Sequence, residues 1–223
     1  MKITISIDEK VFIKDPNSSE VGRKIIQYSI LHIEEIGFES FTFKKLADKI
    51  GASEPTIYRY FENKHKLLLY LLSWYWNWME YKLMIATTNV SSPDERLRIS
   101  LKLLSEPIEK DPNFEHVDEA ALYKIVISES SKVYLNKEVD KVNKEGLFLS
   151  YKRLCHGVAK IITEINPNYR FPRALVSTVV ESSHDQRFFA EHLPALTEIK
   201  MEKLNSTSDF LSEMVFNTIK RID

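Results

Sequence analysis

A glycine between two short helical patterns constrains this chain more than any other feature. The apolar side chains before it recur at the spacing of one helix face, at Phe43, Leu46, Ala47 and Ile50. Thr42 suits the N-cap of that helix, because its hydroxyl can accept a bond from a free backbone N–H of the first turn. Gly51 then ends the helix at little cost, since glycine readily adopts a positive φ.

A second short helix is expected directly after this turn. Ser53 can cap it, and Ile57 and Phe61 point to one side of it. The opposite side and the flanks carry polar or exposed residues, namely Pro55, Thr56, Tyr58, Arg59 and Tyr60. This arrangement predicts a helix-turn-helix whose second helix enters the major groove of DNA. The alternative is a pair of packed helices in a structural bundle without nucleic acid.

At these residues the sequence resembles the TetR family of bacterial transcriptional regulators. The resemblance runs from Ser19 to about Leu72, and its residues are Phe41-Thr42, Leu46-Ala47, Gly51, Ser53, Thr56, Tyr58-Arg59-Tyr60-Phe61, Asn63-Lys64 and Leu67-Leu68. It implies an all-α, cofactor-free homodimer that binds a double-stranded DNA operator. A larger C-terminal domain would dimerise and hold an unknown small-molecule effector. The implied function is transcriptional regulation, most often repression that a ligand relieves.

The resemblance also implies which residues contact DNA. Those matching positions that contact the DNA backbone are Thr42, Lys44, Tyr58 and Lys64. Those matching base-proximal positions are Glu54, Pro55, Thr56 and Tyr60. Lys45, Ser53 and Arg59 complete the predicted DNA-binding set. An acceptor-only side chain at Glu54 suits the amino group of cytosine, although Glu54 could equally face solvent or pair with a lysine.

The charge distribution restricts the kind of DNA binding that is expected. The 223 residues carry a formal net charge of −1, whereas a general nucleic-acid coat protein would be strongly basic. The stretch from Lys44 to Lys66, however, contains six basic residues and only three acidic ones. Binding must therefore come from this local patch, and a dimer would sum two copies of it.

The composition also indicates where the protein works. A single cysteine, Cys155, excludes an intrachain disulfide and favours a reducing compartment. The N-terminal residues lack the apolar core of a signal peptide, and the most apolar run, Leu67 to Met79, is too short to span a membrane. We therefore expect a soluble cytoplasmic protein without a membrane partner.

The chain divides into three predicted regions. Residues 1–18 form an extension in which Ile3, Ile5 and Ile7 alternate with polar residues. This period of two predicts a short β-hairpin that returns through Val11 to Ile13, with a disordered arm as the alternative. Residues 19–66 form the three-helix DNA-binding domain, and residues 67–223 form the helical effector-binding and dimerisation domain.

The C-terminal region is predicted to contain only helices. After a start signal at Ser92-Pro93, the expected segments are roughly 114–134, 147–165, 172–191 and 196–222, with a further surface helix beginning within 136–145. The last three long helices carry more apolar surface than one small domain needs. We expect the dimer interface to draw on them.

The fourth helix, which begins after an N-cap at Asn63, is apolar nearly all round. A helix of that kind is buried on all sides. Trp74, Trp78 and Tyr81 share one face and, with Tyr123, are the candidate ligand-binding residues. The alternative is that these aromatic side chains are only core.

No catalytic or metal site is predicted. The side chains of adjacent pairs such as Cys155-His156 and His184-Asp185 diverge by about 100° on a helix, so neither forms a nucleophile–base pair. The chain is therefore not expected to be an enzyme. A helical enzyme that binds a small molecule, or a protein-interaction module without operator binding, remains the alternative reading.

Overall fold

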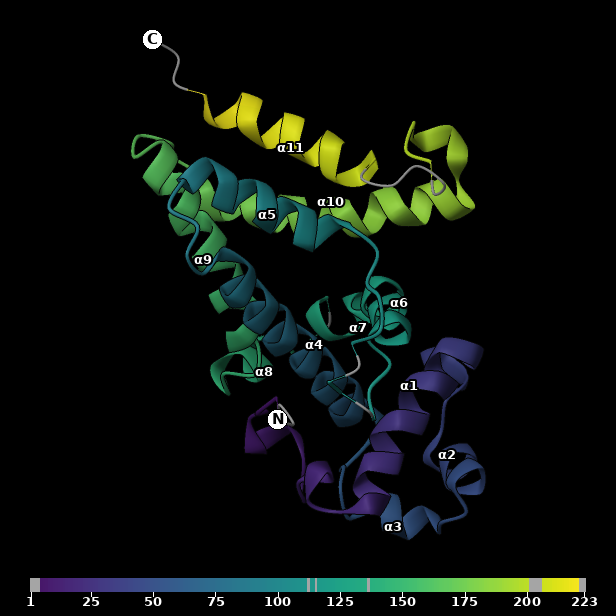
Figure 1. The fold of residues 1–223 in the computed structure, drawn as a ribbon. Coiled ribbons are helices and arrows are strands. Elements are labelled where there is room, and N and C mark those ends of the chain that lie inside the picture. The colour runs from purple at the N-terminus through teal and green to yellow at the C-terminus, as the bar shows by residue number, and fades with distance from the viewer. Residues whose placement is uncertain (1–4, 112, 115, 136, 201–205, 221–223) are drawn as a thin grey trace. The chain divides into compact units, whose positions relative to one another are not determined.

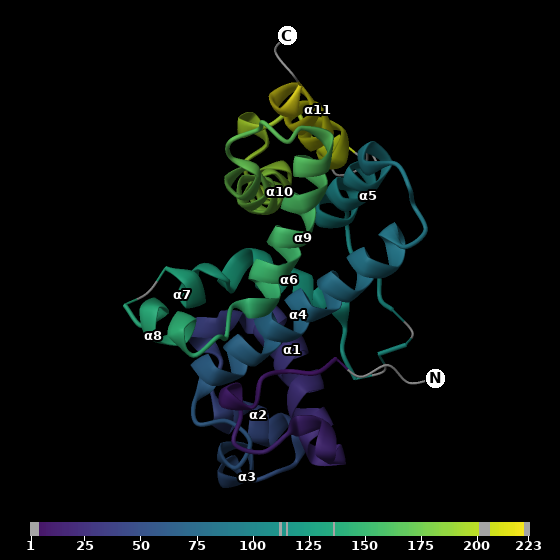
Figure 2. The same ribbon diagram turned by 90° about the vertical axis from the view of Figure 1, so that its left-hand side faces the viewer.

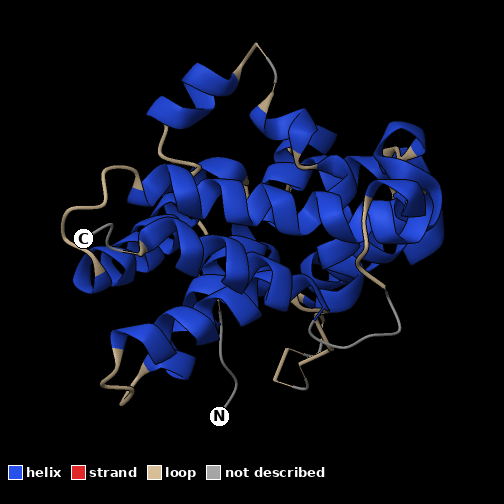
Figure 3. Ribbon diagram, turned by 90° about the horizontal axis from the view of Figure 1, so that it is seen from above, coloured by secondary structure: helices blue, strands red, loops and turns tan. Residues whose placement is uncertain are grey.

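The computed structural model describes residues 5–111, 113–114, 116–135, 137–200 and 206–220. Every regular element in these ranges is a helix, and Figure 3 shows no strand among them. The all-α prediction is therefore confirmed. None of the described helices is long and apolar enough to cross a bilayer.

The helices are labelled in Figure 1. The α-helices are α1 (Glu20–Ser40), α2 (Phe43–Ile50), α3 (Glu54–Tyr58), α4 (Lys64–Thr87), α5 (Pro93–Ser105), α6 (Glu119–Glu129), α7 (Ser131–Tyr134), α8 (Val139–Lys144), α9 (Leu149–Ile165), α10 (Pro172–His192) and α11 (Ser206–Ile219). Short 3-10 turns are η1 (Glu9–Val11), η2 (Pro16–Ser18) and η3 (Pro194–Leu196).

The chain forms two compact units. Unit 1 comprises Met1–Trp78 and Ile108–Ser150, and unit 2 comprises Met79–Pro107 and Tyr151–Asp223. Unit 1 thus contains the predicted DNA-binding region, the first part of α4 and the α6–α8 segment. The assignment of effector binding and dimerisation to residues 67–223 stays a prediction.

Local capping explains where the first helices begin and end. Ser19 Oγ accepts a bond from the backbone N–H of Gly22 (3.0 Å) and starts α1. Asn63 Oδ1 accepts from the N–H of Lys66 (2.9 Å), as expected for the cap of α4. Gly37 has φ 75° and ψ 156°, a conformation that is essentially restricted to glycine, and it breaks the helical hydrogen bonding of α1 three residues before its end.

The predicted N-terminal β-hairpin is wrong over the described residues, and Ile3 lies outside them. The Asp8 side chain accepts from the N–H of Lys10 (2.9 Å), and the resulting turn η1 buries Val11. The N–H of Ile13 donates to the carbonyl of Tyr60 (2.7 Å) rather than to a neighbouring strand. A local side-chain cap and a contact with a distant backbone carbonyl thus replace strand pairing.

Two helix predictions also need correction. The segment 114–134 is interrupted: α6 begins only after Asp118, whose side chain accepts from the N–H of Ala121 (2.9 Å), and α7 follows as a separate turn. In the segment 196–222, η3 precedes Thr197, and the helix described there is α11. Residues 201–205 and 221–223 of that prediction lie outside the described residues.

Unit 2 is built on α5, α10 and α11, which pack against one another (Figures 1 and 2). The Ser183 hydroxyl of α10 donates to the carbonyl of Leu104 (3.0 Å). Asn166 Nδ2, just after α9, donates to the carbonyl of Ile219 (3.0 Å) at the end of α11. These side chains satisfy backbone groups in the interior, where an unpaired carbonyl would be costly.

Candidate nucleic-acid interface

The helix-turn-helix forms as its sequence predicts. Thr42 Oγ1 accepts from the N–H of Lys45 (3.2 Å) and caps α2. Phe43, Leu46 and Ala47 are buried, and Gly51 ends α2 in the left-handed conformation with φ 66°. Because glycine has no Cβ, Gly51 adopts this φ without strain and the chain can turn into α3. Figure 1 shows α1, α2 and α3 grouped together in unit 1.

The short helix α3 buries one side and exposes the other. Ile57 is fully buried, while Pro55 and Tyr58 are exposed, as is Arg59 immediately after the helix. Ser53 occupies the N-cap position without the expected side-chain cap, because its hydroxyl pairs with that of Thr56 (2.8 Å). The exposed side therefore presents hydroxyl groups and one guanidinium.

The predicted DNA-contact residues divide by their exposure. The exposed members are Thr42, Lys44, Lys45, Ser53, Pro55, Tyr58 and Arg59, and the half-buried ones are Glu54, Thr56 and Lys64. The Tyr58 ring packs edge-on against Phe43 with centroids 5.0 Å apart, which fixes its direction at the surface. Ten of the eleven residues thus retain some accessible surface.

Tyr60 is the exception among the predicted base-proximal residues. It follows α3, is only 4% exposed, and its hydroxyl lies 2.7 Å from Ser19 Oγ. The hydrogen bond with Ser19 lowers the pKa of the Tyr60 hydroxyl. The burial of Tyr60 speaks against base contact and assigns it to the core of unit 1.

Lys64, predicted to contact a phosphate, instead binds backbone carbonyl groups. Its ammonium donates to the carbonyls of Phe38 (3.0 Å), Glu39 (3.1 Å) and Phe41 (3.3 Å). It also lies 4.7 Å from the centre of the Phe38 ring. These contacts satisfy carbonyl groups at the end of α1, so Lys64 orients the helix-turn-helix from within.

The other lysines of the local basic patch differ in how freely they can meet a phosphate. Lys45 Nζ donates to the carbonyl of Ser40 (2.7 Å), and Lys49 Nζ binds Glu35 (2.5 Å). Hydrogen bonding to Lys49 is the largest of the effects that lower the pKa of the exposed Glu35. Lys44 and Arg59 are exposed and are the cations of this patch best placed for a backbone phosphate.

The aromatic residues predicted to bind a ligand pack with one another. Trp74 and Trp78 are stacked with ring centroids 6.1 Å apart, and Tyr123 stacks on Tyr75 at the same distance. Trp74, Trp78 and Tyr123 are at most 3% exposed. Tyr81 is half-buried and belongs to unit 2. Burial favours the core alternative for the three residues of unit 1.

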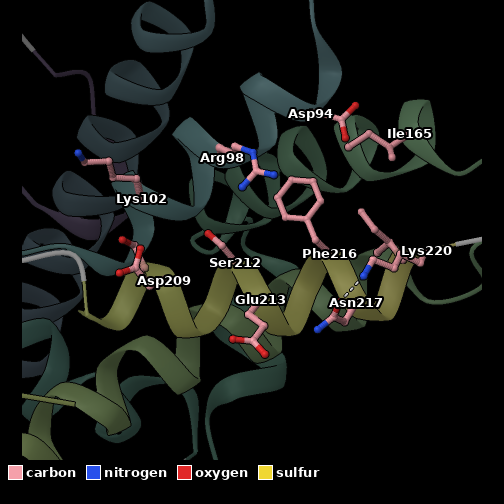
Figure 4. Close-up of a pocket in the computed structure, with 12 residues that line it drawn as sticks. Asp94, Arg98, Lys102, Ile165, Asp209, Ser212, Glu213, Phe216, Asn217 and Lys220 are labelled. Carbon is pink, nitrogen blue, oxygen red and sulfur yellow. Dashed lines mark hydrogen bonds between the residues drawn. The ribbon is translucent and has the colours of Figure 1, made fainter. Parts of the chain in front are cut away.

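A larger hollow lies in unit 2, between α5 and α11 (Figure 4). This α5–α11 groove has a volume of about 790 Å³. Near its middle the Arg98 guanidinium lies 4.3 Å from the centre of the Phe216 ring. The other residues used below, Asp209, Ser212 and Glu213, line it from α11. The groove therefore combines a guanidinium on an aromatic face with further side chains of both charges, which suits a ligand with both polar and apolar parts.

Glu129, a buried carboxylate in unit 1, is not among the residues predicted from the sequence. Its Oε1 accepts from the backbone N–H of Phe38 (3.1 Å), and its Oε2 lies 2.8 Å from Lys132 Nζ. Phe38 and Glu129 are 91 residues apart, so no local pattern predicts the contact. The only signal in the sequence is that Glu129 falls on the same helix face as the apolar residues Leu122, Ile125 and Val126.

A family comparison agrees with this geometry. Residues 32–71 match the sequence model of "Bacterial regulatory proteins, tetR family". That range covers the end of α1, both helices of the helix-turn-helix and the start of α4. The chain carries a TetR-family helix-turn-helix. No protein in the curated set matches the chain.

Solved structures extend the likeness to the whole fold. AibR, solved with isovaleryl coenzyme A and operator DNA, is 12% identical with a TM-score of 0.58, over 87% of this chain and 97% of its own. KstR2 of Mycobacterium tuberculosis, a ketosteroid transcriptional regulator, is 12% identical with a TM-score of 0.55, over 90% and 94%. The superantigen PfiT is 14% identical with a TM-score of 0.59, over 92% and 97%. At these identities the likeness establishes the TetR-like fold and nothing about ligands.

Proposed function

We propose that this protein is a sequence-specific DNA-binding transcriptional regulator, and that it represses until a small molecule releases it. The observation that carries the proposal is the exposed side of α3. Pro55, Tyr58 and Arg59 face solvent while Ile57 anchors the helix. A helix that buries one side and offers polar groups on the other can enter a major groove.

The accessible residues have two proposed roles. Lys44, Tyr58 and Arg59 are placed to bind phosphates, which positions the protein without reading sequence. Glu54 and Thr56, with Pro55 between them, lie at the start of α3 and are the proposed base-reading residues. Thr42, Lys45 and Ser53 flank these groups at the surface.

We propose that the protein acts as a homodimer. Two recognition helices about 34 Å apart would reach successive turns of one DNA face. The expected interface draws on α9, α10 and α11. Static light scattering at micromolar concentration tests this, and a monomer would contradict it.

We propose that the effector binds in the α5–α11 groove and not at the buried aromatic residues Trp74, Trp78 and Tyr123. Its volume of about 790 Å³ falls within the usual range for ligand pockets, about 300–1,000 Å³. Trp74 and Trp78, by contrast, are buried against each other. AibR, which shares the fold, was solved with a small molecule and operator DNA together.

The groove can be tested by filling it. Ser212→Trp should abolish the response to an effector found by screening, while operator affinity stays within about threefold. Phe210→Trp is the control, because Phe210 is exposed on the same helix and does not line the groove. An effector response that survives Ser212→Trp would place the effector elsewhere.

The function itself is tested by selecting DNA from a random pool with the purified protein. Enrichment of a motif with two related half-sites is expected. Arg59→Ala should weaken binding to all sequences alike, because a phosphate contact is lost. Lys110→Ala, which removes an exposed cation outside the helix-turn-helix, should not. No enrichment would favour the enzyme or the protein-interaction module, and a promoter–reporter assay distinguishes repression from activation.

A further inference from the structure

The end of α1 is held in place by a carboxylate from a distant part of the chain. Gly37 leaves the helical conformation, so the N–H of Phe38 cannot continue the α1 hydrogen-bond ladder. Glu129 Oε1 accepts this N–H at 3.1 Å, and Glu129 is only 7% exposed. A buried N–H without a partner is costly, so the Glu129 side chain matters to this backbone conformation.

Glu129 also belongs to an ion-pair network that reaches the same residues. Lys132 Nζ lies 2.8 Å from Glu129 Oε2 and 2.7 Å from Glu39 Oε1. It also lies 5.7 Å from the centre of the Phe38 ring. α6 and α7 therefore contact the end of α1 through one backbone bond, one shared ammonium and one aromatic face.

The start of α4 also contacts the same residues. Lys64 Nζ binds the carbonyls of Phe38, Glu39 and Phe41, and the His65 ring packs edge-on against Phe38 with centroids 5.3 Å apart. We call residues Gly37 to Phe41, with Lys64, Glu129 and Lys132 bound to them, the α1–α2 joint. The joint is thus contacted both from the start of α4 and from α6 and α7.

The α1–α2 joint is connected to the DNA-binding helices by very few residues. Only Phe41 and Thr42 separate α1 from α2, Phe41 is fully buried, and Thr42 caps α2. A shift of the Phe38 backbone must therefore move the first turn of α2. Because α3 packs on α2, the surface proposed to face DNA moves with it.

We infer that Glu129 is a positioning residue for DNA recognition, which sets the placement of α2 and α3 by binding the backbone of Phe38. This inference rests on the proposed function. Glu129 does not touch DNA in this role. It orients the groups that do, so its loss should affect specific binding, which needs two half-sites in register, more than non-specific binding.

The test compares variants at Glu129 with a matched ion pair. Glu129→Ala removes both contacts, whereas Glu129→Gln keeps an acceptor for Phe38 and removes the charge that faces Lys132. The control is Lys124→Gln, which breaks the exposed pair of Lys124 with Glu34 (2.6 Å) between the same helices α6 and α1. Circular dichroism melts establish the folded fraction of each variant at the assay temperature.

Affinity and spacing are measured by fluorescence anisotropy on the selected operator, on operators with one base pair inserted or removed, and on scrambled DNA. Glu129→Ala should weaken operator binding about tenfold and change scrambled-DNA affinity by less than about twofold. The affinity of Glu129→Ala should differ less than that of wild type among the three operator spacings. Glu129→Gln should lie between wild type and Glu129→Ala, and Lys124→Gln should match wild type. Equal losses on operator and scrambled DNA, in proportion to the unfolded fraction, would overturn the inference.

A second readout does not depend on DNA. Hydrogen exchange of peptides that cover residues 38–50 should speed up in Glu129→Ala, while peptides of α4 beyond Leu69 stay protected. If the wild-type protein selects no DNA motif, the proposed function fails, and this exchange pattern still decides whether Glu129 holds the joint. Unchanged exchange at residues 38–50 would overturn the inference in either case.

Discussion

The hydroxyl of Tyr60 lies 2.7 Å from the hydroxyl of Ser19, which itself caps the first helix. Ser19 stands at the start of α1 and Tyr60 just after α3, so this one bond connects the two ends of the DNA-binding region. It holds a residue that was expected to meet DNA bases in the interior of unit 1.

Tyr60→Phe should therefore lower stability without changing what is read. Loss of one hydrogen bond in the interior is expected to cost about 1 kcal/mol of the free energy of unfolding. Urea denaturation measures that cost, and DNA selection with the variant measures specificity. A changed base preference at any position of the half-site would return Tyr60 to the contact set.

Lys44→Met and Lys64→Met should separate phosphate contact from internal support. Lys44 is exposed, so its loss should reduce the slope of log K against log salt by about one. Lys64 binds three carbonyls, so its loss should leave the slope unchanged and reduce stability by roughly 1–3 kcal/mol. Salt titrations and thermal melts measure both. If the slope falls for Lys64→Met instead, its ammonium turns to DNA on binding.

Glu54→Gln should change the sequence that is selected. A carboxylate only accepts hydrogen bonds and suits the amino group of cytosine, whereas an amide can also donate. Removing the charge should in addition raise non-specific affinity, because the repulsion from nearby phosphates is lost. Selection followed by sequencing compares the two proteins, and identical motifs would show that Glu54 does not read a base.

Trp78→Ala should behave as a core truncation. Trp78 is fully buried, and truncating such a residue typically costs about 3–5 kcal/mol. DNA binding should fall in proportion to the folded fraction, which melts and anisotropy measure together. A variant of nearly wild-type stability that has lost its effector response would instead support the ligand-binding role predicted for this aromatic face.

His184 should make the stability of the protein depend on pH. Burial lowers its pKa from 6.5 to about 4 in the folded protein. The unfolded chain therefore binds the proton first as the pH falls, so stability is full above about pH 6.5 and decreases between about pH 6.5 and 4. The loss should approach about 3 kcal/mol at the acid end. His184→Gln should flatten this part of the curve in urea titrations at several pH values, and an unaltered slope would exclude His184 as its origin.

Local sequence was sufficient for the elements whose signals lie within a few residues. The caps at Thr42 and Asn63 and the turn at Gly51 use side chains or φ preferences next to the groups they satisfy. The all-α class followed from the same helical spacing. Such signals can be read from a single stretch because the partner is never more than one turn away.

The features that could not be predicted from the sequence depend on distant partners. The N-terminal alternation predicted a strand, but Ile13 meets the carbonyl of Tyr60. Lys64 was assigned to DNA because of its position in a motif, yet carbonyls 23–26 residues away bind it. The contact of Glu129 with Phe38 joins residues 91 positions apart, so no local pattern could predict it. Each of these contacts depends on tertiary packing, which brings together residues that lie far apart in the sequence.

The break at Gly37 separates the direction of the bend before α2 from its stiffness. The direction is possible because Gly37 adopts a backbone conformation that essentially only glycine can adopt. The stiffness comes from Glu129, Lys132 and Lys64, which act from outside. Releasing those side chains would therefore leave a bend that Gly37 still permits but that no longer holds α2 in one placement. In such a protein, α2 and α3 can become less precisely placed and more mobile while each helix stays folded.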